Sequence, residues 1–199
     1  MGFLFENCVF EELTDSVVAE CEAFSCGNED LDDFFRHDAL RYARFLMGKT
    51  YCFRLSEERE RIVCAFTVSN DSIRIYDLPR GRRDYMKSLT HHEKHLRRYP
   101  GVLIGRLGVG TDFARKGIGS EVLDFIKGWF LSRTNKTGYR FVIVDAVNSD
   151  EVISFYQKNG FQPLFSSEKQ EAAYTLGKGM ADEPLSTRLL YFDLLSLVD

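Results

Sequence analysis

The chain has 199 residues, of which 44% are hydrophobic and 28% are charged, and it contains only four prolines. This composition is typical of a globular protein, and nothing in it indicates a disordered chain. Single domains commonly contain about 100 to 200 residues, so we predict one domain over residues 1–199. The formal net charge of −4 argues against a protein whose whole surface binds nucleic acid.

The N-terminal sequence MGFLFENCVFEELTD has no basic leader, and its first acid is Glu6. This is not the pattern of a secretory signal, and Glu6 does not fit the myristoylation pattern that Met-Gly begins. No apolar run approaches the roughly 20 residues that span a bilayer. We therefore expect a cytoplasmic protein without a membrane partner. The five cysteines are odd in number and not closely paired, so neither disulfides nor a metal site is predicted.

In the first third of the chain, hydrophobic periodicity predicts strands at residues 7–13, 50–55 and 61–70. The last two flank a charged turn and are expected to form an antiparallel hairpin. A helix is predicted within residues 24–48, with Asn28 and acids at its start and a glycine after its end.

The rest of the chain continues to alternate between helices and strands. The predicted elements are a helix at 81–97, a strand at 101–109, a helix at 118–130, a strand at 140–147, a helix at 148–159, a short strand at 161–165 and a last strand at 187–198. Glycines inside the strand at 101–109 often mark a bulge or the close approach of another backbone or a ligand. Together these elements predict an α/β fold with helices on both faces of a mixed sheet of about seven strands. The sheet is expected to be antiparallel at its start and parallel at strands four and five.

Positive charge is concentrated in residues 79–100, which contain seven Lys or Arg and two acids, a net of 7 − 2 = +5. The remainder therefore carries −4 − 5 = −9. This cluster lies in a basic insertion, residues 71–100, between the third and fourth predicted strands. A solvated helix face explains the cluster most simply, and contact with an acidic ligand or RNA is the alternative.

The loop between the predicted strand at 101–109 and the following helix reads ARKGIGS. Backbone N–H groups at a helix start bind anions, and Gly117 and Gly119 would let a phosphate approach them. Two common phosphate motifs are excluded, because a P-loop needs Lys-Ser/Thr where Ser120-Glu121 stand and a dinucleotide fingerprint needs glycine in place of Val122. Without further context, a basic turn between glycines is an equal alternative.

Two linked motifs supply that context. RLGVGTDFARKGIGSEVLDFI, followed after one strand by DAVNSDEVISFYQKNGFQPL, resembles the GNAT superfamily of acyl-CoA-dependent N-acyltransferases. In that family the first loop, Gln/Arg-x-x-Gly-x-Gly/Ala, binds the pyrophosphate of acetyl-CoA, and the second motif places a tyrosine beside the thioester sulfur. Here Ala114 replaces the Gln/Arg, and Arg115 is shifted by one position. That position binds largely through its backbone, so the resemblance still implies pyrophosphate binding and a GNAT fold.

The resemblance also implies roles for individual residues. The backbone of Leu107 and Val109 would pair with the pantetheine arm, and the Val109 N–H would face the thioester carbonyl. Tyr156 would protonate the departing CoA thiolate as general acid, the alternative being an aromatic residue in an apolar helix face. The implied cofactor-binding residues are Leu107, Gly108, Val109, Arg115, Lys116, Gly117, Ile118, Gly119, Ser120, Tyr156 and Asn148 or the adjacent Ser149.

Direct attack on a thioester requires a neutral amine, and a lysine-like amine with a pKa of about 10.4 is mostly protonated at neutral pH. Asp145, on the predicted strand at 140–147, is a candidate base, and a water chain is an equal alternative. His91, His92 and His95 are expected to be surface residues.

Three hypotheses describe the acceptor. The preferred one is an acetyl-CoA-dependent N-acetyltransferase of a small amine or a protein amine. FSCGNEDLDDFF and LIGRLGV also resemble toxin-type GNATs that acetylate aminoacyl-tRNA, in which case the +5 cluster would contact RNA phosphates. The third is a binding module that senses acyl-CoA without turnover. Dimers are common in the family, which makes a homodimer a candidate assembly.

Overall fold

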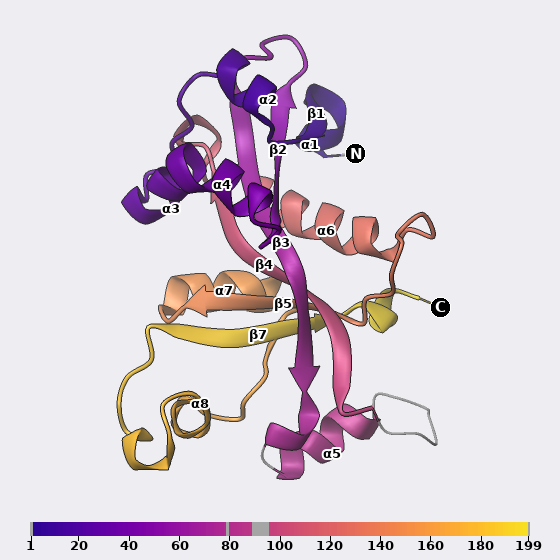
Figure 1. Cartoon of the computed structure of the whole chain (residues 1–199), viewed down its shortest axis with the longest axis vertical. Coiled ribbons are helices and arrows are strands. Elements are labelled where there is room, and N and C mark those ends of the chain that lie inside the picture. The colour runs from indigo at the N-terminus through magenta and orange to yellow at the C-terminus, as the bar shows by residue number, and fades with distance from the viewer. Residues whose placement is uncertain (1, 79, 89–95, 199) are drawn as a thin grey trace. The chain divides into compact units, whose positions relative to one another are not determined.

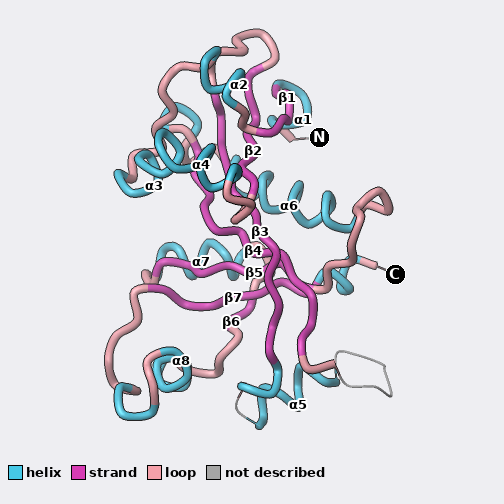
Figure 2. The backbone as a smooth tube through the Cα atoms, in the orientation of Figure 1, coloured by secondary structure: helices cyan, strands magenta, loops and turns pink. Residues whose placement is uncertain are grey.

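Seven strands form one sheet in the computed structural model, which describes residues 2–78, 80–88 and 96–198 (Figures 1 and 2). The strand order is β1-β2-β3-β4-β5-β7-β6. The strands are β1 (Cys8–Glu12), β2 (Lys49–Leu55), β3 (Ile62–Arg74), β4 (Arg98–Val109), β5 (Phe141–Val147), β6 (Gln162–Pro163) and β7 (Thr187–Asp193). β4 and β5 are parallel and the other neighbours are antiparallel, which confirms the predicted mixed sheet.

The chain divides into two compact units. Unit 1 comprises Met1–Ser69 and Ile104–Ser132, and unit 2 comprises Asn70–Leu103 and Arg133–Asp199. The long strands β3 and β4 each contribute residues to both units. The single domain over residues 1–199 stays a prediction.

The helices of unit 1 are short except for the last. They are α1 (Phe3–Asn7), α2 (Asp15–Glu20), α3 (Glu29–Asp33), α4 (Ala39–Arg44) and α6 (Ile118–Leu131), with a π-helical turn at Phe34–Asp38 and a 3₁₀ turn at Thr111–Phe113. The helix predicted within residues 24–48 corresponds to α3, the π-helical turn and α4. It begins where expected, because the Asn28 side chain accepts a hydrogen bond from the Leu31 N–H at 3.1 Å.

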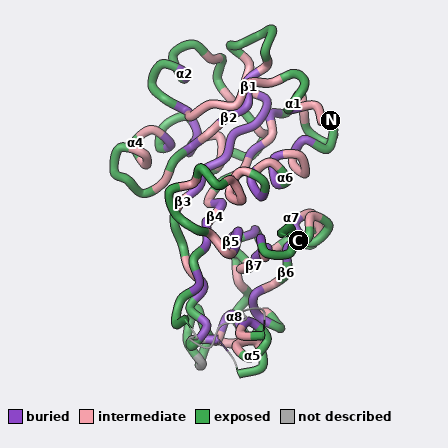
Figure 3. Tube along the Cα trace, turned by 90° about the vertical axis from the view of Figure 1, so that its right-hand side faces the viewer, coloured by how far each residue is buried: buried purple, intermediate pink, exposed green. Residues whose placement is uncertain are grey.

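The strands of unit 1 are covered by helices on both faces, and β2 and β3 are largely buried there (Figure 3). Cys52 and Ala65 are paired across β2 and β3 and pack against the α2 to α4 side. Their neighbours Tyr51 and Phe66, also paired, point to the opposite face. There Trp129 of α6 lies 4.7 Å and 6.3 Å from their ring centroids. The period-two alternation of the strands therefore builds two apolar layers.

Unit 2 contains α5 (Arg80–Ser88), α7 (Asp150–Lys158) and α8 (Glu168–Thr175), with 3₁₀ turns at Ile75–Asp77, Lys178–Met180 and Leu194–Leu197. Its core joins side chains from β3, β4, β5, β7 and α5. Gly101 of β4 is required there by packing, because an added Cβ would lie 2.6 Å from Ile143 Cδ1 and 3.1 Å from the Phe141 carbonyl oxygen. The backbone of β4 therefore lies close to β5 at this glycine.

The helix predicted at residues 81–97 is only partly correct. α5 ends at Ser88, and residues 89–95 lie outside the described residues. The prediction was wrong for Leu96 and Arg97, because β4 begins at Arg98, three residues before the predicted strand. Pro100 favours an extended residue before it, and Tyr99 is buried in the core of unit 2.

Other boundaries differ as well. β3 continues to Arg74, so the basic segment between the third and fourth strands spans residues 75–97 rather than 71–100. α7 begins at Asp150, and residues 148 and 149 precede it. The last predicted strand, 187–198, was too long, because β7 ends at Asp193 and the Asp193 side chain accepts from the Leu195 N–H at 3.0 Å to start a 3₁₀ turn. Among the described helices, none combines the length and apolarity needed to cross a bilayer.

Candidate active site

The loop between β4 and α6 is anchored to the rest of unit 1 by its backbone. The Gly110 N–H donates to the Val63 carbonyl at 2.8 Å, and the Thr111 N–H donates to the Ser25 carbonyl at 3.1 Å. Ile118, the first residue of α6, is only 2% exposed. These contacts hold both ends of the loop in place.

The backbone of this loop has the geometry of an anion-binding nest. Arg115 and Gly117 have positive φ values of 60° and 83°. Two such residues close together turn successive N–H groups toward one side. Gly117 is also the N-cap of α6, contributes no capping side chain, and would meet no heavy atom within 4 Å if it carried a Cβ. The Ser120 N–H donates to the Gly117 carbonyl at 3.0 Å, whereas the N–H groups of Ile118 and Gly119 precede the first intrahelical hydrogen bond, so the positive end of the helix dipole faces open space.

The two cations of the loop differ in their surroundings. The Lys116 Nζ donates to the Asp112 carbonyl at 2.8 Å and lies 5.8 Å from the centre of the Phe113 ring. Arg115 is exposed beside it. Arg61, the residue before β3, pairs with the Asp112 carboxylate at 2.8 Å and holds the start of the loop. The charge of Lys116 thus stays close to the loop, while the nest itself is formed by backbone.

The end of β4 belongs to unit 1, as the loop does. Leu107 and Val109 are half-buried, and Gly108 is buried. An added Cβ at Gly108 would lie 3.1 Å from Cys26 Sγ and 3.2 Å from Phe35 Cε2. Gly108 is therefore explained by packing against the α3 side. The pairing of Leu107 and Val109 with pantetheine stays a prediction.

Tyr156 lies on α7 in unit 2 and is 7% exposed. Its ring packs against Phe155 and Phe161, with centroids 5.1 Å and 5.4 Å away. Burial raises the pKa of its phenol to about 12. The phenol is consequently protonated throughout the physiological pH range, which suits a proton donor and excludes a role as a base there.

Asn148 and Ser149 both have structural partners within unit 2. The Asn148 amide nitrogen donates to Glu168 Oε1 and to the Leu185 carbonyl, each at 2.8 Å. Ser149 caps α7 by accepting from the Val152 N–H at 3.4 Å. Contact of either residue with CoA stays a prediction.

Asp145 lies on β5, where its side chain reaches the surface. Desolvation by surrounding protein atoms, and then the negative charge of Asp71, raise the pKa of its carboxyl above the ordinary value. A carboxylate with a raised pKa is a stronger base at neutral pH. His91, His92 and His95, which were expected to be surface residues, lie outside the described residues. No group of three metal-ligating side chains occurs within residues 2–78, 80–88 and 96–198.

We expect Asp145→Asn to raise the melting temperature at pH 7. A carboxyl whose pKa is raised in the folded state opposes folding when it is ionised, so this destabilisation is absent below the unfolded pKa near 3.8 and present above the folded pKa. Thermal melts should therefore show a more stable variant at pH 7 and no difference at pH 3. A variant that melts lower than the wild type at pH 7 would contradict this environment for Asp145.

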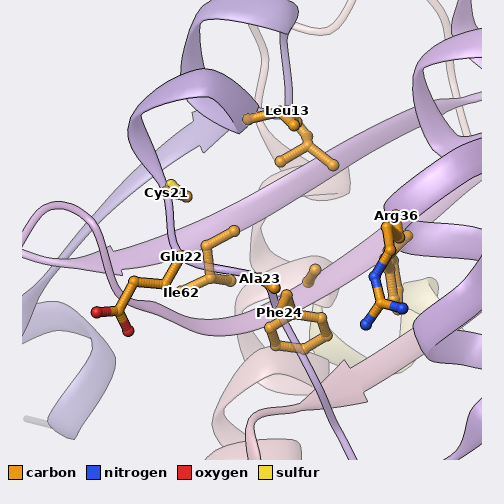
Figure 4. Close-up of a pocket in the computed structure, with 10 residues that line it drawn as sticks. Leu13, Cys21, Glu22, Ala23, Phe24, Arg36 and Ile62 are labelled. Atoms are coloured by element: carbon orange, nitrogen blue, oxygen red, sulfur yellow. The ribbon is translucent and has the colours of Figure 1, made fainter.

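Unit 1 also contains an apolar pocket of about 260 Å³ that none of the predicted site residues lines. Figure 4 shows Leu13 at the top of the view, Ile62 and Phe24 below it, and Glu22 and Arg36 on opposite sides. It lies on the face of the sheet covered by α2 to α4 and is separate from the loop at Arg115–Ser120.

Sequence patterns missed a second pocket, of about 250 Å³, in unit 2. Part of its wall comes from α8, in a stretch without clear periodicity. A signal for this helix was present, because Ser167 and Gln170 have the spacing of a capping box and the Ser167 hydroxyl accepts from the Gln170 N–H at 3.3 Å.

Residues 85–163 match the family model described as an acetyltransferase (GNAT) domain. Over this segment the chain is similar to GNAT acetyltransferase domains. All of the predicted site residues, from Leu107 to Tyr156, lie inside the matched segment. Acetyl-CoA is the cosubstrate of this family, as the resemblance of the two motifs implied.

Solved structures share the GNAT fold over nearly the whole chain. AtaT complexed with acetyl-methionyl-tRNAfMet matches with a TM-score of 0.70 and 18% identity, covering 96% of this chain and 97% of AtaT. A tyrosine-to-phenylalanine mutant of KacT matches with a TM-score of 0.67 and 17% identity, covering 96% and 98%. AtaTR bound with AcCoA matches with a TM-score of 0.65 and 18% identity, covering 96% of each chain. No curated protein sequence matches significantly. At these identities the likeness confirms the fold.

Proposed function

We propose that the chain transfers an acetyl group from acetyl-CoA to a primary amine. The observation that carries this proposal is the open, glycine-capped start of α6, where Gly117 follows a loop with the conformation of an anion-binding nest. In the GNAT family this loop binds the pyrophosphate of acetyl-CoA. Residues Arg115–Ser120 would hold that pyrophosphate mainly through backbone N–H groups.

The chemistry requires two proton movements. The amine nitrogen attacks the thioester carbonyl carbon, the C–S bond breaks, and the products are an amide and CoA. Asp145 would accept the proton that the amine loses, and the Val109 N–H would polarise the carbonyl. Tyr156 would pass its proton to the departing sulfur. The raised pKa of the phenol keeps the proton on Tyr156 until the thiolate forms.

Aminoacyl-tRNA is a second candidate acceptor, and a hollow in unit 2 favours it. Arg74, Tyr76, Arg97 and Arg98 line a space of about 500 Å³. The Lys87 Nζ lies 5.3 Å from the centre of the Tyr76 ring. Guanidinium groups beside an exposed aromatic ring suit RNA phosphates and bases. The similar protein AtaT has been solved in complex with acetyl-methionyl-tRNAfMet.

A panel of amines, peptides and charged tRNAs, read by CoA release, tests both candidates. We expect thiol release with at least one amine. Arg97→Glu should abolish acetylation of charged tRNA and spare that of small amines if RNA is the acceptor, and expression of the wild type should then arrest growth. Harmless expression and no acetylated tRNA would exclude the second candidate. Acetyl-CoA binding without thiol release in the presence of any amine would indicate a non-catalytic acyl-CoA-binding module. It would exclude both acetyl transfer to an amine and acetyl transfer to charged tRNA.

A further inference from the structure

A glutamate in the first turn of α6 caps the first helix of the chain. Gly2, at the start of α1, contributes no capping side chain. Instead, the Phe3 N–H donates to Glu121 Oε1 at 3.1 Å, and the Leu4 N–H donates to Glu121 Oε2 at 2.9 Å. The first N–H groups of a helix need such acceptors, because they have no partner inside the helix. Both carboxylate oxygens of Glu121 are therefore held by the backbone of α1.

These hydrogen bonds lie beside the loop that is proposed to hold the pyrophosphate. The Phe3 ring packs against Phe113 of this loop, with centroids 6.0 Å apart. Leu4 is fully buried, which anchors α1 in unit 1. α1, the loop and α6 all belong to that unit. Glu121 thus connects the N-terminal segment to the helix whose start would bind the anion.

The carboxylate of Glu121 would compete with a pyrophosphate if α1 released it. Side chains of a helix point toward its N-terminus. In a capping box a glutamate reaches back to the N–H three residues before it, and for Glu121 that N–H belongs to Ile118. The N–H groups of Ile118 and Gly119 precede the first intrahelical hydrogen bond and are the ones open to an anion. A released carboxylate would occupy one of these donors and repel the phosphate charge.

In the structure this carboxylate lies away from the space before α6. A Cβ added to Gly117 would meet no heavy atom within 4 Å, so the Glu121 side chain does not fill that space. A Cβ added to Gly2, in contrast, would lie 2.6 Å from Glu121 Cδ. The backbone of Gly2 is extended, with φ of −97° and ψ of 167°, which other residues also adopt. Glycine at position 2 is therefore explained by the room that it leaves for the carboxylate.

We propose that the start of α1 positions acetyl-CoA indirectly, by withdrawing the Glu121 carboxylate from the N–H groups that bind the pyrophosphate. Phe3 and Leu4 act through their backbone, and Gly2 acts by leaving room. Within residues 2–78, 80–88 and 96–198, no Lys or Arg pairs with Glu121, so its charge is held by these backbone donors. This inference rests on the proposed acetyl-CoA site and adds positioning residues outside the two GNAT motifs.

Gly2→Val should weaken acetyl-CoA binding, measured by calorimetry on the full chain. Valine adopts an extended backbone readily, and its side chain would displace the Glu121 carboxylate. We expect the Kd to rise about tenfold, as it does when about one tenth of the molecules keep the site open. Binding of S-acetylpantetheine, which has no pyrophosphate, should not change. Gly138→Val is the matched control, because Gly138 is exposed and an added Cβ would meet no heavy atom within 4 Å.

Glu121→Ala separates this role from simple support of the loop by α1. Because it removes the competing anion, Glu121→Ala alone should bind acetyl-CoA at least as tightly as the wild type. Combined with Gly2→Val, it should restore the wild-type Kd. If α1 only supported the loop, Glu121→Ala would instead weaken binding as Gly2→Val does, and the double variant would not recover.

Three results would overturn the inference: an unchanged Kd for acetyl-CoA in Gly2→Val, an equal loss of S-acetylpantetheine binding in that variant, or weaker acetyl-CoA binding by Glu121→Ala. Failure of the proposed function is distinguishable, because it is visible before any substitution. A wild type that binds acetyl-CoA no more tightly than S-acetylpantetheine would overturn the pyrophosphate site and this inference with it.

Discussion

Replacing Gly117 with glutamate is expected to lower the affinity for acetyl-CoA by at least about 100-fold. The new side chain would occupy the open space before α6 and bring a carboxylate to the position proposed for the pyrophosphate. Loss of two hydrogen bonds to a charged group, at about 1.5 to 3 kcal/mol each, is sufficient for this effect. Isothermal titration calorimetry with acetyl-CoA measures it directly.

Gly177→Glu is a matched control for backbone strain. Gly177 has a positive φ of 105°, and an added Cβ would again meet no heavy atom within 4 Å. A side chain is therefore disfavoured at both positions by the backbone alone. We expect the two variants to lose similar stability and only Gly117→Glu to lose affinity. Equal loss of affinity in both would show that strain, and not blocked phosphate binding, explains the result.

Tyr156→Phe is expected to lower kcat by about 10²- to 10⁴-fold, the usual contribution of a positioned general acid. The phenyl ring keeps its packing against Phe155 and Phe161, so the melting temperature and the acetyl-CoA affinity should change little. Rates of CoA-thiol release under saturating acetyl-CoA check the prediction. Because the pKa of Tyr156 is about 12, any loss of activity between pH 8 and pH 10 must come from another group.

Tyr191→Phe is the control for removing a buried phenol. Tyr191 lies on β7 in the core of unit 2, and burial raises the pKa of its phenol as well. It has no counterpart in the GNAT motifs, so its variant should retain kcat. A Tyr156→Phe enzyme with more than half of the wild-type kcat would exclude the role of general acid.

Strongly periodic segments were predictable because local pattern and tertiary packing agree in them. β5 is an apolar run and forms a buried strand, and α6 shows its apolar face at helical spacing and packs that face on unit 1. β3 was predicted to end at Asn70, but it ends at Arg74. The strand continues because Ile73 and Ile75 enter the core of unit 2, which local sequence does not reveal.

The candidate site was predictable where function depends on backbone geometry. Gly117 marks a left-handed N-cap that few other residues tolerate, so the motif is visible in the sequence. The pocket of unit 2 was not predictable, because Asp71, Phe165, Tyr174 and Leu189 are brought together only by tertiary structure. The pairing of Asp145 with Leu189 likewise depends on the register of β5 and β7, which no local pattern specifies.

Binding of acetyl-CoA compared with S-acetylpantetheine, which lacks the pyrophosphate, tests most directly whether the loop Arg115–Ser120 recognises that group. Calorimetry on the wild type should show at least about 100-fold tighter binding of acetyl-CoA. In Gly117→Glu the two ligands should bind with nearly equal, weak affinity. Equal binding of both ligands by the wild type, or a preference for acetyl-CoA that survives in Gly117→Glu, would contradict a pyrophosphate site at the start of α6.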